Sequence, residues 1–168
     1  AREEYYKLSD CFCWFWLHFK ENKQIQETDY WQHHLKEPEI TSWRGIAFEE
    51  ICFQHISQIK KALQIGGVSS HESALIIKGN DHTEGLQIDL LIDRADDVVN
   101  ICEMKYCKSE YIVTKDYASK LVHRQSLLEA QQPDKTFHLT LVSTGTLQRN
   151  EYADTFTSIV TLDDLFSQ

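Results

Sequence analysis

The chain of 168 residues is long enough for one domain with a hydrophobic core and a small appendage. Its net charge of −9 excludes a surface that grips nucleic acid through bulk positive charge, so any contact with DNA has to be local. Five cysteines without a framework spacing, and no secretory signal before them, favour a reducing cytoplasm.

The N-terminal segment predicts a helix rich in aromatic residues. Tyr5 to Lys7 indicates a short strand, and Ser9 or Asp10 is expected to cap the helix that follows. The aromatic run at residues 11–17 is too short to cross a bilayer. A helix that is apolar on nearly every side needs partners, so we expect self-association through this surface.

Two cysteines in this segment are candidate zinc ligands. Cys11-x-Cys13 could combine with His33 and His34, but structural zinc sites use a Cys-x₂₋₄-Cys spacing and a second pair, which is missing. We therefore expect no zinc site. The chain begins without methionine, which leads us to expect a fragment of a longer protein.

A polar connector and a long helix follow. Residues 20–41 read as a connector with room for a short helix, and Ser42 is expected to cap a helix from Trp43 to Leu63. The three-four spacing puts Glu49 on the apolar side of this helix and Glu50 on the solvated side. We therefore expect two parts: an N-terminal extension at residues 1–41, and the main domain at residues 42–168.

The next segment predicts three strands. The first runs from Val68 to Lys78, with a turn at residues 79–81. Residues 87–94 and 98–106 then read as a tight β-hairpin, because two apolar runs flank the small acidic connection at residues 95–97.

This hairpin brings chemistry-bearing side chains together. If it centres on Asp96, Asp89 lies opposite Glu103 with their Cβ atoms roughly 4.5–5.5 Å apart. Lys105 projects from the same face as Glu103, because side chains alternate along a strand. Two carboxylates can hold Mg²⁺, and the lysine can orient an attacking water. The alternative is an ordinary sheet surface, on which Lys105 is only an ion-pair partner of the carboxylates.

The remaining elements complete an α/β pattern. A helix is expected at Lys115–Gln131, strands at residues 136–143 and 158–161, and a short helix at residues 162–166. Gln125 lies on the apolar side of the long helix and is expected to satisfy backbone groups. Asp93 shares the face of Asp89 but lies roughly 13 Å from it along the strand, so it cannot share the same ion.

The order of these elements resembles the PD-(D/E)xK nuclease superfamily. Glu49 stands on the first helix, Asp89 on the second strand and Glu103-x-Lys105 on the third. The resemblance implies a restriction-endonuclease-like αβββαβ core, with a mixed sheet flanked by helices. It departs from the pattern at Ile88, where many members have proline.

A closer resemblance extends beyond this core. Tyr6-Lys7-Leu8-Ser9-Asp10, Gly45-Ile46-Ala47-Phe48-Glu49 and Asp163-Asp164-Leu165-Phe166 resemble the C-terminal region of archaeal-type AAA+ family ATPases, which also occur in Bacteroidetes. In that family a P-loop ATPase and a winged helix precede this region. The chain has no Gly-x₄-Gly-Lys-Ser/Thr, so it is not the motor itself.

The resemblance implies a set of site residues and partners. Asp89 and Glu103 would be ligands of Mg²⁺ or Mn²⁺, together with the Met104 carbonyl, while Glu49 and Lys105 would complete the catalytic set. The expected function is metal-dependent hydrolysis of DNA phosphodiesters, in a domain attached to ATPase and winged-helix segments. The alternative is a catalytically silent nuclease-fold module for nucleic-acid or protein binding and assembly, which the acidic net charge favours.

Overall fold

The computed structural model describes residues 8–21, 29–77 and 85–167. The chain forms two compact units, residues 1–51 and 52–168. The boundary expected after residue 41 falls within helix α3 (Pro38–Gln54). The strand predicted at Tyr5 to Lys7 and the turn predicted at residues 79–81 lie outside the described residues.

The first unit is helical in its described residues. It contains α1 (Cys11–Phe15), the π-helix η1 (Trp16–Glu21), α2 (Tyr30–His34) and most of α3. Asp10 caps α1, because its Oδ1 accepts a hydrogen bond from the Cys13 amide at 2.6 Å. Of the two predicted caps, Ser9 and Asp10, the structure has Asp10, and the predicted short helix in the connector is confirmed.

Four aromatic rings form the core of this unit. Phe15, Phe19, Trp31 and Trp43 contact one another in all six pairs, with ring centroids 5.2–5.7 Å apart. Most of these pairs meet edge to face, the geometry that the ring quadrupole favours. Phe19 is 1% exposed. The aromatic run at residues 11–17 contributes Phe15 to this core, while its Phe12, Trp16 and Leu17 are exposed.

The long helix differs from its prediction in three ways. It begins at Pro38 rather than after Ser42, since proline suits the first helical turn. It breaks at His55, whose φ of −116° and ψ of 27° are not helical, and α4 (Ile56–Ala62) follows. The prediction that Glu50 is solvated is wrong: Glu50 is buried, whereas Glu49 is half-buried and Ile46 exposed. The buried residues of α3 therefore do not lie on the face that the three-four spacing of apolar residues predicted.

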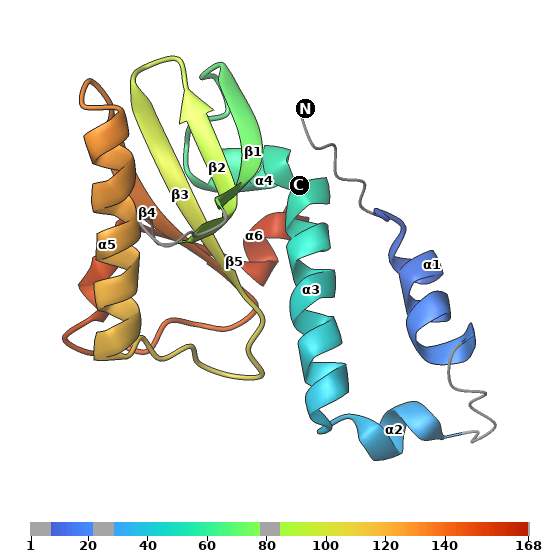
Figure 1. The fold of residues 1–168 in the computed structure, drawn as a ribbon. Helices are drawn as coiled ribbons and strands as arrows, with labels where there is room; N and C mark the ends of the chain where they lie inside the picture. Colours follow the sequence, from blue (N-terminus) through green and yellow to red (C-terminus); the bar gives the residue numbers. More distant parts are fainter. Residues whose placement is uncertain (1–7, 22–28, 78–84, 168) are drawn as a thin grey trace. The chain divides into compact units, whose positions relative to one another are not determined.

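The second unit is built on a mixed sheet of five strands, in the order β1-β2-β3-β4-β5 (Figure 1). Its described elements after α4 are β1 (Ser70–Ile77), β2 (Leu86–Arg94), β3 (Val98–Lys105), α5 (Lys115–Gln131), β4 (Thr136–Ser143), the 3₁₀ turn η2 (Ala153–Thr155), β5 (Ser158–Thr161) and α6 (Leu162–Phe166). The pairs β1–β2 and β2–β3 are antiparallel, and β3–β4 and β4–β5 are parallel. The predicted α/β class is confirmed, including the bounds of α5, β4, β5 and α6.

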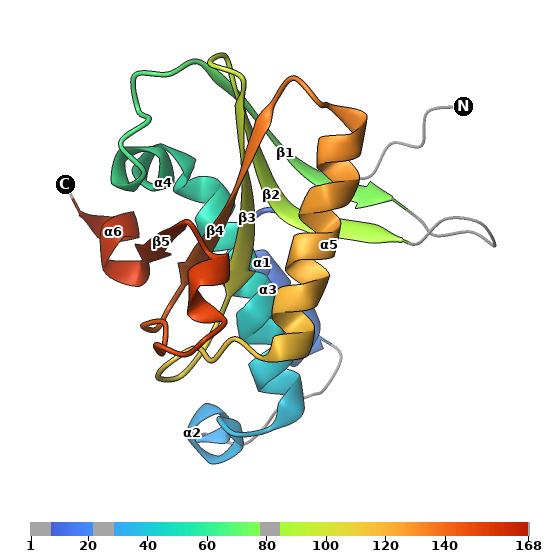
Figure 2. The same ribbon diagram turned by 90° about the vertical axis from the view of Figure 1, so that its left-hand side faces the viewer.

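Helices cover both faces of the sheet. Figure 2 shows α5 on one side and α4 and α6 on the other. The core beneath α5 joins Ala118, Leu121 and Leu128 of the helix to the odd-numbered residues of β3 and β4, such as Ile101 and Leu139. This packing follows from the alternation of side chains along a strand, and it fixes which face of β3 looks toward α5.

The register of the β2–β3 hairpin agrees with its prediction. Leu90 pairs with Cys102 and Asp93 with Val99, so the hairpin centres on Asp96 as expected. No helix within the described ranges 8–21, 29–77 and 85–167 is both long enough and apolar enough to cross a membrane.

All four tryptophans, at positions 14, 16, 31 and 43, lie in the first unit, so tryptophan fluorescence reports on that unit. Phe19→Ala removes a ring from the four-ring core and should lower its free energy of unfolding by about 3–5 kcal/mol. Chemical denaturation followed by tryptophan fluorescence measures this change. Phe12→Ala is the matched control at an exposed ring, and its effect should stay within about 0.5 kcal/mol. Equal losses in the two variants would contradict the assignment of the core.

Candidate functional site

The site begins with an irregularity in β2. Ser73 of β1 pairs with Leu91, yet Leu75 pairs with Ile88, so two steps along β1 correspond to three along β2. The extra residue makes a β-bulge at Asp89 and Leu90, and a bulge re-aims the side chains that follow it. In agreement, Ile88 and Leu91 both contact the core beneath α5, although strict alternation would send them to opposite faces.

At the bulge, the Asp89 carboxylate takes the position that a backbone carbonyl of β2 would have in a regular strand pair. Pairing of β2 with β3 is observed as far as Leu90 and Cys102. Beyond this point Asp89 Oδ2 accepts a hydrogen bond from the backbone N–H of Met104 at 3.0 Å. A side chain thus satisfies an amide of β3 and holds the carboxylate against the strand that carries Glu103 and Lys105.

Glu103 lies at the centre of a polar cluster beneath α5. The residue is 4% exposed. Its Oε1 accepts a hydrogen bond from the Tyr117 hydroxyl and forms an ion pair with Lys105 Nζ. Its Oε2 faces Arg124 NH1 at 3.4 Å. Lys105 Nζ also lies 5.2 Å from the centre of the Tyr117 ring, within the range of a cation–π contact.

The charges in this cluster shift the pKa values of its members. Burial, followed by repulsion from Glu103, raises the pKa of the Asp89 carboxyl. Burial alone would lower the pKa of Lys105, but the Glu103 and Asp89 carboxylates outweigh it and raise the pKa. Burial and the Glu103 charge also raise the pKa of Tyr117. Lys105 therefore stays a charged donor at neutral pH, and Tyr117 stays a neutral one.

The structure brings three of the sequence-predicted residues together: Asp89, Glu103 and Lys105. Glu49 lies on α3 in the first unit, and its part in this site stays a prediction. Met104 contributes its amide to Asp89, while its carbonyl as a metal ligand also stays a prediction. Among the described residues, no cluster of three or more histidine, cysteine, aspartate or glutamate side chains could hold a metal ion.

Sequence reasoning missed Tyr117 and Arg124. Both lie on α5 and are seven residues apart, which places them on the same side of the helix, two turns from each other. That spacing was a usable signal, since a tyrosine and an arginine there can reach the carboxylates of the sheet. Gln125 instead donates to Glu129 and to the Phe137 carbonyl, which agrees with the role expected for it.

Other charged residues of the hairpin have partners of their own. Asp93 accepts two hydrogen bonds from Lys135, at 2.6 and 2.7 Å, and Arg94 pairs with Asp96. All five cysteines are free thiols, and burial raises the pKa of Cys102 to about 12. Cys102 is therefore a core residue rather than a nucleophile.

The end of β3 is held by the loop after β4. Thr144 Oγ1 accepts from the Cys107 amide at 2.8 Å and donates to the Cys107 carbonyl at 2.7 Å. The Thr144 amide donates to the Lys105 carbonyl at 3.2 Å. Gly145 is required beside them, because a Cβ there would lie 1.6 Å from the Ser109 carbonyl oxygen. This close approach fixes the backbone from which Lys105 projects.

Comparisons with known proteins do not identify the chain. No family model matches it, and no curated protein matches it. It is similar to the crystal structure of a protein of unknown function, AF1548, with 17% sequence identity and a TM-score of 0.44. The match covers 66% of this chain and spans 56% of that protein's chain.

Tyr117→Phe removes the hydrogen bond to a buried carboxylate and should lower the free energy of unfolding by about 1.5–3 kcal/mol. Denaturation followed by far-ultraviolet circular dichroism measures the change in the sheet unit. Tyr111→Phe is the matched control, since no hydrogen bond of its hydroxyl is found among the described residues. Equal losses of unfolding free energy in the two variants would contradict a stabilising role for the hydrogen bond between Tyr117 and Glu103.

Asp89→Asn should stabilise the metal-free protein at pH 7 by about 0.5–2 kcal/mol. Because the folded-state pKa of Asp89 is raised, folded Asp89 retains a proton that the unfolded chain releases, so its contribution to stability falls as pH rises through the folded pKa. Asparagine cannot ionise and can still accept from Met104.

Thermal melts between pH 4 and 7 in the presence of a chelator test this prediction. The difference in melting temperature between Asp89→Asn and the wild type should grow as pH rises above about 3.9, the pKa of aspartate in the unfolded chain. An advantage that is constant over this range, or that shrinks with rising pH, would contradict it.

Proposed function

We propose that this protein hydrolyses nucleic-acid phosphodiesters in a reaction that requires Mg²⁺ or Mn²⁺, in a domain of the PD-(D/E)xK nuclease type. The observation that carries the proposal is the bulge of β2, which brings the Asp89 carboxylate to the Met104 amide beside Glu103 and Lys105. An aspartate and a Glu-x-Lys pair on adjacent antiparallel strands are the arrangement that the sequence resemblance implies.

The donor set fits a hard divalent cation. Two carboxylates lie close enough that the charge of Glu103 raises the pKa of Asp89, and a cation between them would relieve that repulsion. Asp89 Oδ1 has no hydrogen bond among the described residues, and Glu103 Oε2 has a single contact, with Arg124. These two oxygens would hold the ion. When bound, it would lower the pKa of a coordinated water.

Lys105 and Tyr117 have defined parts in such a site. Lys105 keeps its proton at neutral pH, so it can donate to the attacking water or to the charge that develops on the phosphoryl oxygens, and it is not the base. Tyr117 positions Glu103 through its hydroxyl. Glu49 and the Met104 carbonyl belong to the proposal as predicted members of the set.

A second function is favoured by the partners of Glu103. Tyr117, Lys105 and Arg124 already satisfy most of the hydrogen-bonding capacity of this carboxylate. A buried carboxylate neutralised in this way can be purely structural. The alternative is therefore a catalytically silent nuclease-fold module that binds nucleic acid or protein.

Nicking of supercoiled plasmid tests the proposal. The protein should nick in Mg²⁺ or Mn²⁺ and not in chelator, and Asp89→Asn should reduce the rate by about 10² or more, because it removes the negative charge of a ligand of the ion. Asp93→Asn is the matched control: it neutralises an aspartate of the same strand that is engaged by Lys135, and it should nick like the wild type.

Calorimetry with Mn²⁺ separates the proposal from the alternative. The wild type should show binding heat, and Glu103→Gln little. Equal binding by the two proteins, together with no nicking under any condition, would exclude the hydrolase and favour the silent module.

A further inference from the structure

The sheet unit has a small hollow beside the polar cluster, between α5 and the start of β2. It measures about 180 Å³ and is lined by Gly85, Leu86, Lys120, His123, Arg124 and Leu127. At about 30 Å³ per water, it has room for roughly six waters, and hence for a tetrahedral oxyanion such as a phosphate group. Lys120 and Arg124 are cations, and none of the described residues that line the hollow is a carboxylate.

This charge pattern differs from that of other hollows in the unit. One, beside α4, combines Lys60 with Glu72. Another, at the turn of the β2–β3 hairpin, combines Arg94 and Lys135 with Asp93 and Asp97. In a chain with a net charge of −9, a hollow whose described lining holds two cations and no carboxylate is a local exception, although Arg124 also pairs with Glu103 of the polar cluster.

The two cations have donors to offer. Lys120 is exposed and has no ion pair or hydrogen bond within the part of the chain that the structure describes. Arg124 donates to Glu103 through Nη1. A guanidinium carries five N–H donors, so this contact leaves others for a ligand. Tyr117, Lys120 and Arg124 follow one another at three- and four-residue spacing, so the hollow lies on the same flank of α5 as the polar cluster.

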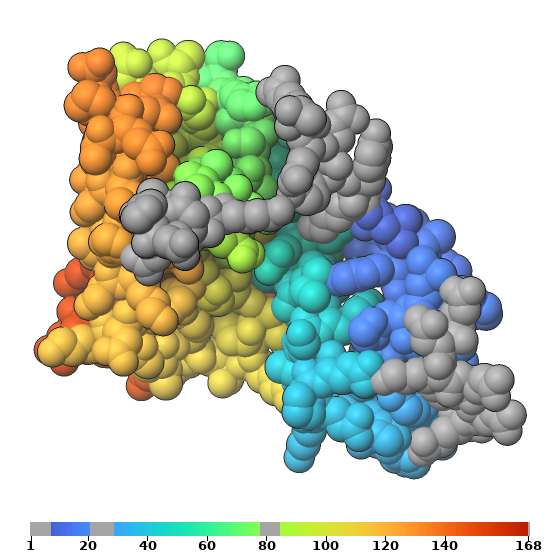
Figure 3. Space-filling model, in the orientation of Figure 1, coloured from blue at the N-terminus to red at the C-terminus, as the bar shows by residue number. Residues whose placement is uncertain are grey.

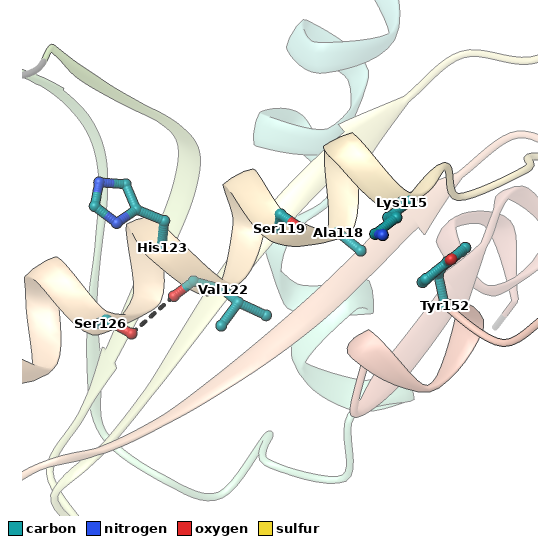
Figure 4. A pocket seen from close by; sticks show the side chains of 7 residues that line it. All are labelled: Lys115, Ala118, Ser119, Val122, His123, Ser126 and Tyr152. Carbon is teal, nitrogen blue, oxygen red and sulfur yellow. Dashed lines mark hydrogen bonds between the residues drawn. The ribbon is translucent and has the colours of Figure 1, made fainter.

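A second hollow continues along the outer side of the helix. It measures about 510 Å³, shares His123 with the first, and is lined also by Lys115, Ser119 and Ser126 (Figure 4). Figure 4 shows Lys115 beside Tyr152 at one end of this stretch and His123 toward the other. Its lining, as far as the described residues form it, contains no carboxylate either. The helix lies open at the surface, gold to orange in Figure 3.

From these observations we infer that the hollow at Lys120 and Arg124 is a binding site for a backbone phosphate of a nucleic-acid strand, which continues over His123 toward Lys115. A row of cations and hydroxyls along a helix suits a chain of phosphates better than a single anion, because successive phosphates meet successive donors. The inference rests on the proposed function, since it identifies the flank of α5 as the surface on which the substrate lies.

Fluorescence anisotropy with a labelled oligonucleotide, single-stranded and as a duplex, tests the inference in chelator, where no cleavage occurs. Lys120→Gln should weaken binding on the order of fivefold and reduce the slope of log K against log salt by about 0.7 for the single strand or 0.9 for the duplex. Lys61→Gln is the matched control, an exposed lysine of α4 on the opposite side of the sheet (Figure 2).

Three results would overturn the inference. The first is unchanged affinity and salt slope in Lys120→Gln, and the second is an equal change in Lys61→Gln. The third is full displacement of the oligonucleotide by inorganic phosphate at constant ionic strength, which would assign the hollow to a small phosphorylated ligand.

The outcome is independent of the plasmid assay. Nicking without any effect of Lys120→Gln on binding would leave the hydrolase in place and remove this site. An effect of Lys120→Gln on binding without nicking would retain the site and support the silent module.

Discussion

The hydrogen bond from the Met104 amide to Asp89 Oδ2 is the contact on which the arrangement of the site depends. In a regular antiparallel ladder this amide would bind a carbonyl of β2, and the Asp89 side chain would point out of the sheet. The bulge removes that pairing, and the carboxylate takes the acceptor's place. A buried strand amide without an acceptor is costly, so the side chain that satisfies it is held firmly. The same contact places Asp89 near Glu103, whose charge then raises its pKa.

The cluster around Glu103 shows how the fold tolerates these charges. Asp89 and Glu103 carry two negative charges, and Lys105 and Arg124 supply two positive ones within the same group of contacts. Tyr117 adds a hydrogen bond without adding charge. Desolvating a carboxylate costs several kcal/mol unless partners offset it, so Tyr117 and Arg124 of α5, together with Lys105, allow Glu103 to be buried. The site therefore depends on the packing of α5 against the sheet.

Much of this arrangement could be predicted from residue patterns, and the parts that could not have identifiable causes. The hairpin register followed from one acidic connection between two apolar runs, because the turn fixes which residues are opposite. The bulge at Asp89 could not be predicted, since it depends on how β1 pairs with β2, a contact that leaves no period in the sequence. The burial of Glu50 escaped prediction for a similar reason: helical spacing gives the relative orientation of side chains but not which side is covered. The spacing of Tyr117 and Arg124 indicates a shared side of the helix, but their contacts with Glu103 follow only once that helix is placed over β3.

Arg124 connects the polar cluster with the cationic hollow, and its geometry makes it the most easily displaced partner of Glu103. Its contact with Oε2 is 3.4 Å long, whereas a charged hydrogen bond between nitrogen and oxygen is about 2.7–2.9 Å. Of the three partners of Glu103 it is the one held at the longest distance, and Oε2 is the oxygen that a cation would need. A phosphate in the hollow would draw the guanidinium toward itself and so leave Oε2 open, while a cation at Oε2 would repel Arg124 toward the hollow. Each ligand would then favour the other by the same free energy, because coupling between two binding sites is reciprocal.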